Sequence, residues 1–194
     1  MQNLDKEFWD LRWQQGTTGW DIGYASPALI TFMESYPNKS AKILIPGCGN
    51  AYEAEELINM GYTNIDIVDI SPKAVANLTE KFRGKNAVHS LCCDFFELKG
   101  PYDLILEQTF FCALDPGKRR QYVQQCHDLL NPEGVVAGLL FATAFAADGP
   151  PFGGDADEYR ELFSAKFQIR KLDNCYNSIP KRAGNELFFI LVKM

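Results

Sequence analysis

Lys42-Ile43-Leu44-Ile45-Pro46-Gly47-Cys48-Gly49-Asn50 is the stretch that decides the fold of this 194-residue chain. Its short apolar run predicts a buried strand, and the glycines after it predict a tight turn into a helix over residues 52–60. Such a turn lets a ligand approach the backbone closely, and the free N–H groups at the start of a helix favour negative charge. The stretch therefore predicts a strand, a glycine loop and a helix that together bind part of a cofactor.

A second apolar run, residues 65–68, ends at Asp69, twenty positions after Gly49. An acidic residue at the end of the next strand can accept hydrogen bonds from both ribose hydroxyls of a nucleoside. A dinucleotide loop has a third glycine where this chain has Tyr52, and that bulky residue disfavours a pyrophosphate. The pattern therefore favours S-adenosylmethionine, whose anionic end is one carboxylate, over NAD. A nicotinamide-dependent oxidoreductase on a similar fold stays open as a rival interpretation.

A third predicted strand, residues 88–93, ends in Asp94-Phe95-Phe96. Asp94 can accept a hydrogen bond from the amino group of adenine, and the backbone N–H of Phe95 can donate one to a ring nitrogen. The alternative is that Asp94 caps a turn and both phenylalanines belong to the core. We favour cofactor binding for Asp94 and Phe95, which come third after the glycine loop and Asp69, and the core for Phe96.

Predicted strands and helices alternate along most of the chain. The strands cover residues 43–46, 64–69, 88–92, 102–106 and 135–141, and the helices between them cover residues 52–60, 72–83 and 116–130, with a turn at 131–134. This alternation predicts an α/β fold with a doubly wound, mostly parallel sheet that binds ligands at the carboxyl ends of its strands. Two late strands, 167–172 and 187–192, have no helix between them, so we expect them to be antiparallel.

The composition predicts one domain of ordinary size, with 46% hydrophobic residues available for a core. A net charge of −6 argues against nucleic acid and anionic membranes as partners, and no apolar stretch is long enough to span a membrane. The N-terminus lacks the pattern of a signal peptide. Six cysteines without a C-x-x-C pair and only two histidines predict reduced thiols and no metal site. We expect a cytoplasmic monomer that acts on a small molecule.

All three tryptophans, Trp9, Trp13 and Trp20, lie near the N-terminus. Trp9 and Trp13 are four residues apart and therefore share a helix face. One interpretation is that this helix packs on the sheet and its indoles belong to the core. We favour another, in which residues 1–37 form a helical lid over a Rossmann-like core of residues 38–194. The indole faces would then lie beside the sulfonium cation of the cofactor.

Together, these motifs resemble the thiopurine S-methyltransferase-like superfamily, most of all its branch of plant halide and thiol methyltransferases and their bacterial relatives. The resemblance runs in order over nearly the whole chain. The segments that carry it are Phe8-Trp9-Asp10-Leu11-Arg12-Trp13, Thr18-Gly19-Trp20, Ile45-Pro46-Gly47-Cys48-Gly49-Asn50, Val68-Asp69-Ile70-Ser71, Asp94-Phe95-Phe96, Tyr102-Asp103-Leu104-Ile105, Thr109-Phe110-Phe111-Cys112-Ala113-Leu114 and Gly149-Pro150-Pro151-Phe152.

The resemblance implies a class I S-adenosylmethionine-dependent methyltransferase fold, with a seven-stranded sheet whose last strand is antiparallel. It also implies that the tryptophans line the cofactor pocket, that the glycine loop approaches the methionine part, and that the end of the fourth strand touches the cofactor. The implied cofactor-binding residues are Trp9, Trp13, Trp20, Gly47, Gly49, Asp69, Ile70, Asp94, Phe95, Glu107 and Gln108. Plant relatives often have tyrosine at the positions of Gln108 and Phe141, and these departures argue against halide activity.

We therefore expect a methyltransferase that acts on a small soft nucleophile, either a thiol or a thiopurine sulfur. A thiol with a pKa of about 8.5 is partly ionised at neutral pH, so alignment and desolvation can supply the catalysis without a catalytic base. Phe141 and Phe152 are candidates for an apolar pocket wall. Arg182 is a candidate for attracting an anionic nucleophile, the alternative being a solvated loop arginine. Other functions left open are halide methylation and non-catalytic binding of S-adenosylmethionine or S-adenosylhomocysteine.

Overall fold

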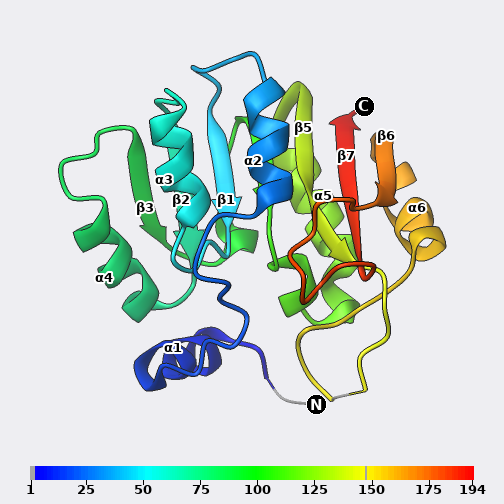
Figure 1. The fold of residues 1–194 in the computed structure, drawn as a ribbon, viewed down its shortest axis with the longest axis horizontal. Coiled ribbons are helices and arrows are strands. Elements are labelled where there is room, and N and C mark those ends of the chain that lie inside the picture. The colour runs from blue at the N-terminus through cyan, green and yellow to red at the C-terminus, as the bar shows by residue number, and fades with distance from the viewer. Residues whose placement is uncertain (1–2, 147) are drawn as a thin grey trace.

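The apolar runs of the sequence form the strands of one seven-stranded sheet (Figure 1). The computed structural model describes residues 3–146 and 148–194. The strands are β1 (Ile43–Pro46), β2 (Ile65–Asp69), β3 (Val88–Cys92), β4 (Tyr102–Glu107), β5 (Leu130–Phe141), β6 (Phe167–Asn174) and β7 (Glu186–Lys193). Their order across the sheet is β3-β2-β1-β4-β5-β7-β6.

Strands β1 to β5 are parallel, and β7 runs antiparallel to both of its neighbours, β5 and β6. This arrangement confirms the predicted doubly wound, mostly parallel sheet with an antiparallel last strand. The strand order reverses between β1 and β4, because β2 lies on one side of β1 and β4 on the other. In an open sheet of this kind, a crevice for ligands forms at the carboxyl ends of the strands at such a reversal.

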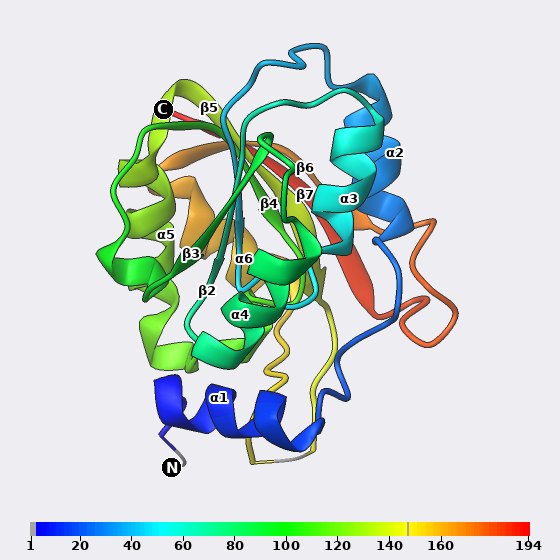
Figure 2. The ribbon, with the colours of Figure 1, turned by 90° about the vertical axis from the view of Figure 1, so that its left-hand side faces the viewer.

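Helices cover both faces of the sheet (Figure 2). The helices on the two faces are α2 (Pro27–Ser35), α3 (Tyr52–Asn59), α4 (Pro72–Lys81), α5 (Arg119–Leu129) and α6 (Ala156–Ser164), and the remaining helix is α1 (Lys6–Gln15). Side chains alternate along β1, so Ile43 and Ile45 pack in the core beneath α2, α3 and α4, whereas Leu44 packs in the core beneath α5 and α6. No helix within residues 3–146 and 148–194 combines the length and apolar character needed to cross a bilayer.

One local detail differs from the predicted boundaries. The start of α4 is as predicted, and the hydroxyl of Ser71 caps it by accepting from the backbone N–H of Ala74. Residues 131–134, predicted as a turn, are a bulge within β5, since Leu130 already pairs with Tyr102. Tyr102 pairs with Leu130 and Leu104 pairs with Val135, so residues 131–134 of β5 are extra residues without their own partners in β4, which defines the bulge.

Helix α1 lies beyond the carboxyl ends of the parallel strands (Figures 1 and 2). Asp5 caps its start by accepting a hydrogen bond from the N–H of Phe8 at 3.0 Å, and Gly16 ends it with a φ of 68°. No residue of α1 is buried. Its tryptophans are therefore not core residues, and α1 covers the edge of the sheet where the ligand crevice is expected.

Candidate functional site

The glycine loop forms the floor of a cavity at the carboxyl end of β1. Gly47 and Gly49 have φ angles of 55° and 54°, which residues with a Cβ rarely adopt. A Cβ on Gly47 would collide with the ring of Phe110, and a Cβ on Gly49 would lie 3.5 Å from the indole of Trp13. Both glycines line the cavity. The absence of a Cβ thus lets the ring of Phe110 pack against the loop, while the backbone of both glycines stays at the cavity surface.

Asp69 ends β2 beside this loop, and Ile70 after it also lines the cavity. The Asp69 carboxylate accepts hydrogen bonds from the backbone N–H groups of Gly49 at 3.2 Å and Ser71 at 2.9 Å. Burial raises the pKa of Asp69, and these two donors oppose the rise. A carboxylate has about four acceptor positions, so the bonds from the backbone leave some of them for a ligand. Two ribose hydroxyls are one pair of donors that would fill them.

Asp94 and Phe95 follow β3 and line the same cavity. Asp94 accepts a hydrogen bond from the backbone N–H of Phe96 at 2.9 Å and so caps a short 3₁₀ helix, residues 95–97. The ring of Phe95 is buried and stacks on Tyr122, with the two ring centroids 5.6 Å apart. Both residues therefore have the structural roles of the alternative interpretation while also bordering the cavity. Phe96, which was expected in the core, lines the cavity as well.

Glu107 lies behind the cavity wall rather than in it. Its fully buried carboxylate accepts hydrogen bonds from the backbone N–H groups of Phe110 (2.8 Å) and Phe111 (2.9 Å) and from the hydroxyl of Tyr122 (3.1 Å). Burial raises the pKa of Glu107 to about 7, against the opposing effect of these three donors. Glu107 thereby holds the segment 109–114, in which Thr109 has a left-handed φ of 58°.

Two other residues of the predicted site also do not line the cavity. The side-chain oxygen Oε1 of Gln108 is buried without a hydrogen-bond partner among the described residues. The backbone N–H of Phe152 donates to the carbonyl of Cys112 at 2.7 Å, and its side chain borders a separate hollow next to Pro116 and Ala142. This bond fixes the turn of the loop, so that residues 150 and 151 form the wall predicted for Phe152.

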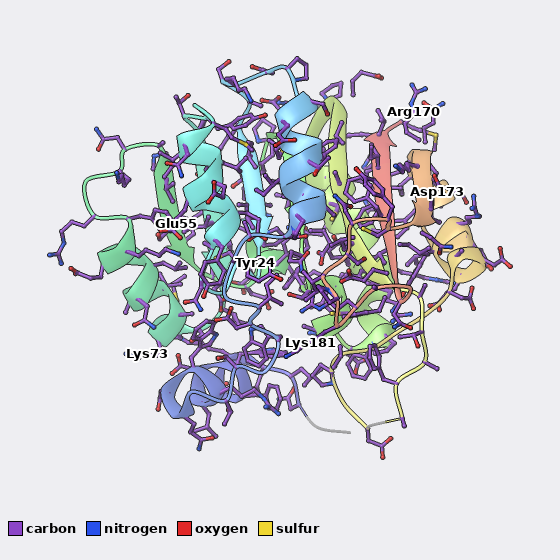
Figure 3. The ribbon with its side chains drawn as sticks, in the orientation of Figure 1. Tyr24, Glu55, Lys73, Arg170, Asp173 and Lys181 are labelled. Atoms are coloured by element: carbon purple, nitrogen blue, oxygen red, sulfur yellow. The ribbon has the colours of Figure 1, made fainter. Side chains whose placement is uncertain are left out.

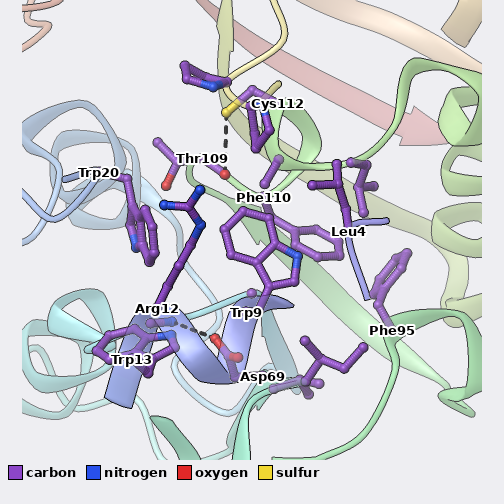
Figure 4. A pocket seen from close by; sticks show the side chains of 18 of the residues that line it. Leu4, Trp9, Arg12, Trp13, Trp20, Asp69, Phe95, Thr109, Phe110 and Cys112 are labelled. Atoms are coloured by element: carbon purple, nitrogen blue, oxygen red, sulfur yellow. Dashed lines mark hydrogen bonds between the residues drawn. The ribbon is translucent and has the colours of Figure 1, made fainter. Parts of the chain in front are cut away.

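Three indoles form the roof of the cavity, as Figure 4 shows. Trp20 packs edge-to-face against Trp9, with ring centroids 5.5 Å apart, and against Trp13 at 6.2 Å. Edge-to-face pairs of this kind stabilise the arrangement of the rings beyond the apolar area that they bury. The tryptophans that the sequence assigned to the cofactor pocket are therefore brought together over the glycine loop and Asp69.

Asp10 of α1 connects this roof to the core. Its carboxylate accepts hydrogen bonds from the Ser71 hydroxyl at 2.6 Å and from the backbone N–H of Lys73 at 2.8 Å. The hydrogen bond from Ser71 is the main reason that the pKa of Asp10 is lowered. Ser71 also donates its backbone N–H to Asp69, so this one residue is hydrogen-bonded both to α1 and to the predicted ribose-binding carboxylate.

Further bonds fasten the segment that follows α1. Asp21 accepts from the side-chain amide of Asn50 at 2.6 Å and from the hydroxyl of Tyr52 at 3.3 Å. Arg182 donates to the carbonyl of Trp20 at 3.1 Å. These contacts were not predicted from the sequence, since each joins residues at least 29 positions apart. Their only sequence signal is that polar residues flank the tryptophan motifs.

The cavity between floor and roof has a volume of about 480 Å³, within the range of small-molecule sites, about 300–1,000 Å³. Away from Asp69, its wall is largely apolar and is formed by Phe110, Cys112, Ala113, Leu114, Phe141, Pro150 and Pro151. Arg182 also lines it, with its guanidinium 5.5 Å from the centre of the Phe141 ring and 3.4 Å from the carboxylate of Glu186. Within the described part of the chain, no cluster of three or more His, Cys, Asp or Glu side chains has the arrangement of a metal site.

The sequence profile of the family described as thiopurine S-methyltransferase matches residues 4–187, nearly the whole chain. The chain belongs to this family. It is 33% identical over 159 residues to a probable thiol methyltransferase 2 of Arabidopsis thaliana, covering 79% of this chain and 70% of the relative. It is also 26% identical to a thiopurine S-methyltransferase of Acinetobacter baylyi, and the match covers 94% of both chains. This member of the family is therefore an S-adenosylmethionine-dependent methyltransferase.

Solved structures show the same fold. One, from a study of the conversion of a disulfide bond into a thioacetal group during echinomycin biosynthesis, has a TM-score of 0.79 at 20% identity and covers 97% of this chain and 92% of that one. Another is Burkholderia thailandensis 1,6-didemethyltoxoflavin-N1-methyltransferase with bound S-adenosylhomocysteine, with a TM-score of 0.75 at 21% identity and coverage of 97% and 87%. These likenesses confirm the class I methyltransferase fold.

The residues of the cavity fit the cofactor of this family, S-adenosylmethionine. Gly47 and Gly49 present backbone to the cavity, and the ring of Phe110 packs where a Cβ of Gly47 would lie. Asp69 has unused acceptor positions for ribose, and the apolar rings of Phe95 and Phe96 border the space beside Asp94. Tyr52 stands where a dinucleotide loop needs glycine, and its hydroxyl is bonded to Asp21. The glycine loop, the carboxylates of Asp69 and Asp94 and the volume of the cavity together suit a ligand in which a nucleoside is joined to an amino acid.

Proposed function

We propose that this methyltransferase transfers a methyl group to the sulfur of a small thiol or thiopurine. The observation that carries the proposal is the chemical character of the cavity wall away from Asp69. No histidine is among the described residues that line the cavity, and Asp69 and Asp94 are its only carboxylates. Both carboxylates already accept hydrogen bonds from the backbone beside the glycine loop and the 3₁₀ turn. Neither is therefore suited to act as a base on an acceptor at the apolar end.

A sulfur acceptor needs no such base. A thiol with a pKa of about 8.5 is ionised to a few per cent at pH 7, and the thiolate is intrinsically very nucleophilic. Amine and alcohol acceptors would bring a polar group into an apolar pocket, which is costly without a hydrogen-bond partner. Bound S-adenosylmethionine supplies an electrophilic methyl group on a sulfonium sulfur, and the chain needs only to align the acceptor with it and exclude water.

Each part of the site has a role under this proposal. Gly47, Gly49, Asp69, Ile70, Asp94 and Phe95 bind the cofactor from the sheet side. The segment from α1 to Trp20 acts as a lid, and its indole faces stabilise a cation beneath them. Helix α2, which the prediction included in the lid of residues 1–37, instead packs on the sheet as part of the core. Glu107 acts as a positioning residue, because its three hydrogen bonds hold the wall segment that contains Phe110. Phe141 and residues 150–151 form the acceptor wall.

The relatives support sulfur as the acceptor, since their names include thiol, thiopurine and thiocyanate methyltransferases. We further propose that the protein acts as a cytoplasmic monomer that does not bind nucleic acid. All six cysteines are free thiols in the described structure, and the net charge is −6.

Steady-state assays on a panel of acceptors test the proposal. S-adenosylhomocysteine release is measured with thiophenol, a thiopurine, bisulfide, iodide, an aromatic amine and a catechol. We expect turnover of the three sulfur acceptors, slow turnover of iodide and none of the amine or catechol. Faster methylation of the amine or the catechol than of any thiol would refute the sulfur assignment. Binding of S-adenosylhomocysteine without turnover of any acceptor would instead favour a non-catalytic binding protein.

A further inference from the structure

Arg12 extends from α1 into the cavity. Figure 4 shows its side chain running between Trp20 and Trp9, with the guanidinium directed into the space that a ligand would occupy. Arg12 lies between Trp9 and Trp13 in the sequence, so it is carried by the same helix that forms the roof. A cation is thus placed inside a cavity whose wall is otherwise mostly apolar and aromatic.

The guanidinium of Arg12 is not neutralised within the described part of the chain. Its Nε is buried and has no hydrogen-bond partner there, and no carboxylate of a described residue lies within ion-pair distance. The guanidinium instead lies over the face of Phe8, 4.4 Å from the ring centre. Arg182, by contrast, reaches Glu186 and the carbonyl of Trp20, and buried Arg119 pairs with Glu158.

A guanidinium is always charged in proteins and has five N–H donors. A buried donor without a partner is costly, so Arg12 is expected to gain one when the cavity fills. Lys118 also lines the cavity, but it is exposed and can keep its hydration. Asp69 and Asp94 line the cavity too, but neither carboxylate is within ion-pair distance of Arg12. The missing partner of Arg12 is therefore best supplied by the ligand.

We propose that Arg12 binds an anionic group of the bound ligands. This inference rests on the proposed function, which identifies two such groups: the carboxylate in the methionine part of the cofactor and the ionised sulfur of the acceptor. The shared chemistry is a compact anion that accepts N–H bonds from the guanidinium. Because Arg12 is on α1, the same contact draws the roof onto the filled cavity and couples ligand charge to closure.

The test compares Arg12→Lys, which keeps the positive charge, with Arg12→Met, which keeps an extended side chain without it. Calorimetry gives the affinity for S-adenosylhomocysteine and for its decarboxylated analogue, which lacks only the carboxylate. Steady-state kinetics give the KM for bisulfide. Arg170→Gln is the matched control, since Arg170 is exposed and lies at the opposite end of the molecule from α1 (Figure 3). Circular dichroism and thermal unfolding establish that each variant is folded.

We expect Arg12→Met to weaken one anion-dependent measurement by about ten- to a hundredfold, the range for hydrogen bonds to charged groups, with partial rescue in Arg12→Lys. Loss of S-adenosylhomocysteine affinity with the decarboxylated analogue unaffected identifies the cofactor carboxylate. Unchanged affinity for both with a raised KM for bisulfide identifies the acceptor anion. Equal losses for S-adenosylhomocysteine and its analogue, or no change in any measurement, would overturn the proposal. The calorimetric arm does not depend on turnover, so failure of the sulfur assignment would be seen separately.

Discussion

Replacing Glu107 by glutamine tests whether ionisation of this buried carboxyl group lowers the stability of the folded protein. Burial raises the pKa of Glu107 from 4.5 to about 7. A group with a raised pKa contributes stability that is fully present below its unfolded-state pKa and is lost as the pH rises through its folded-state pKa. The wild-type protein should therefore lose stability through Glu107 as the pH rises from about 4.5 to about 7.

The expected size follows from the pKa values. One pKa unit corresponds to about 1.4 kcal/mol, so the complete loss is about 3.5 kcal/mol, of which about 2.5 kcal/mol falls between pH 5 and pH 8. Glutamine cannot ionise, and its oxygen can still accept from the N–H groups of Phe110 and Phe111, which both bond to one oxygen of Glu107. The unfolding free energy of Glu107→Gln minus that of the wild type should therefore increase by about 2.5 kcal/mol over this range.

Urea unfolding followed by circular dichroism at pH 5, 6.5 and 8 measures this difference. Glu80→Gln, on the exposed face of α4, is the control for removing a carboxylate as such. A difference between variant and wild type that stays constant from pH 5 to pH 8 would refute the reasoning. Glu107 would then be ionised in the folded protein throughout, and its three donors would outweigh burial.

Three further predictions concern the ligand site. Asp69→Ala should weaken S-adenosylhomocysteine binding about ten- to a hundredfold, because a charged acceptor for the ribose is lost; unchanged affinity of the folded variant in calorimetry would remove Asp69 from the site. Adding S-adenosylhomocysteine should change the intrinsic tryptophan fluorescence, and the Trp9→Phe/Trp13→Phe double variant should lose that change; a full signal and full affinity in the double variant would contradict the lid. Phe141→Tyr should raise iodide turnover relative to thiophenol if the missing hydroxyl limits halide methylation, and an unchanged ratio in the acceptor assay would exclude that cause.

The arrangement of the fold was predictable because local signals agreed with one another. Apolar runs separated by glycine, proline and capping residues identified β1 to β5 and α3 to α5. The alternation of strand and helix then required parallel neighbours. The carboxyl ends of parallel strands meet at one edge of a sheet, so the sequence alone places Gly47, Asp69 and Asp94 together. Their binding of the cofactor stays a prediction.

Glu107 was expected to contact the cofactor, but its side chain points away from the cavity, and the alternation of side chains along β4 could have predicted this. Side chains two apart on a strand face the same way, and Ile105 packs in the core beneath α5 together with Tyr122. Glu107 follows Ile105 by two residues, so the alternation directs its carboxylate toward Tyr122 and away from the cavity. Phe152 offered no such signal, because the path of the proline-rich loop depends on a bond to Cys112, 40 residues earlier.

The contacts of the roof explain why Tyr52 occupies the position of the third glycine. A glycine there would make room for a pyrophosphate, but it would remove the hydroxyl that bonds to Asp21. Asp21 also holds Asn50 of the glycine loop, so the loop and the segment that carries Trp20 are joined at one carboxylate. Under the proposed function, tyrosine at position 52 favours S-adenosylmethionine over a dinucleotide in two ways. Its ring leaves no room for a pyrophosphate at the start of α3. Its hydroxyl holds the lid in place, and the lid keeps water away from the reactive sulfonium.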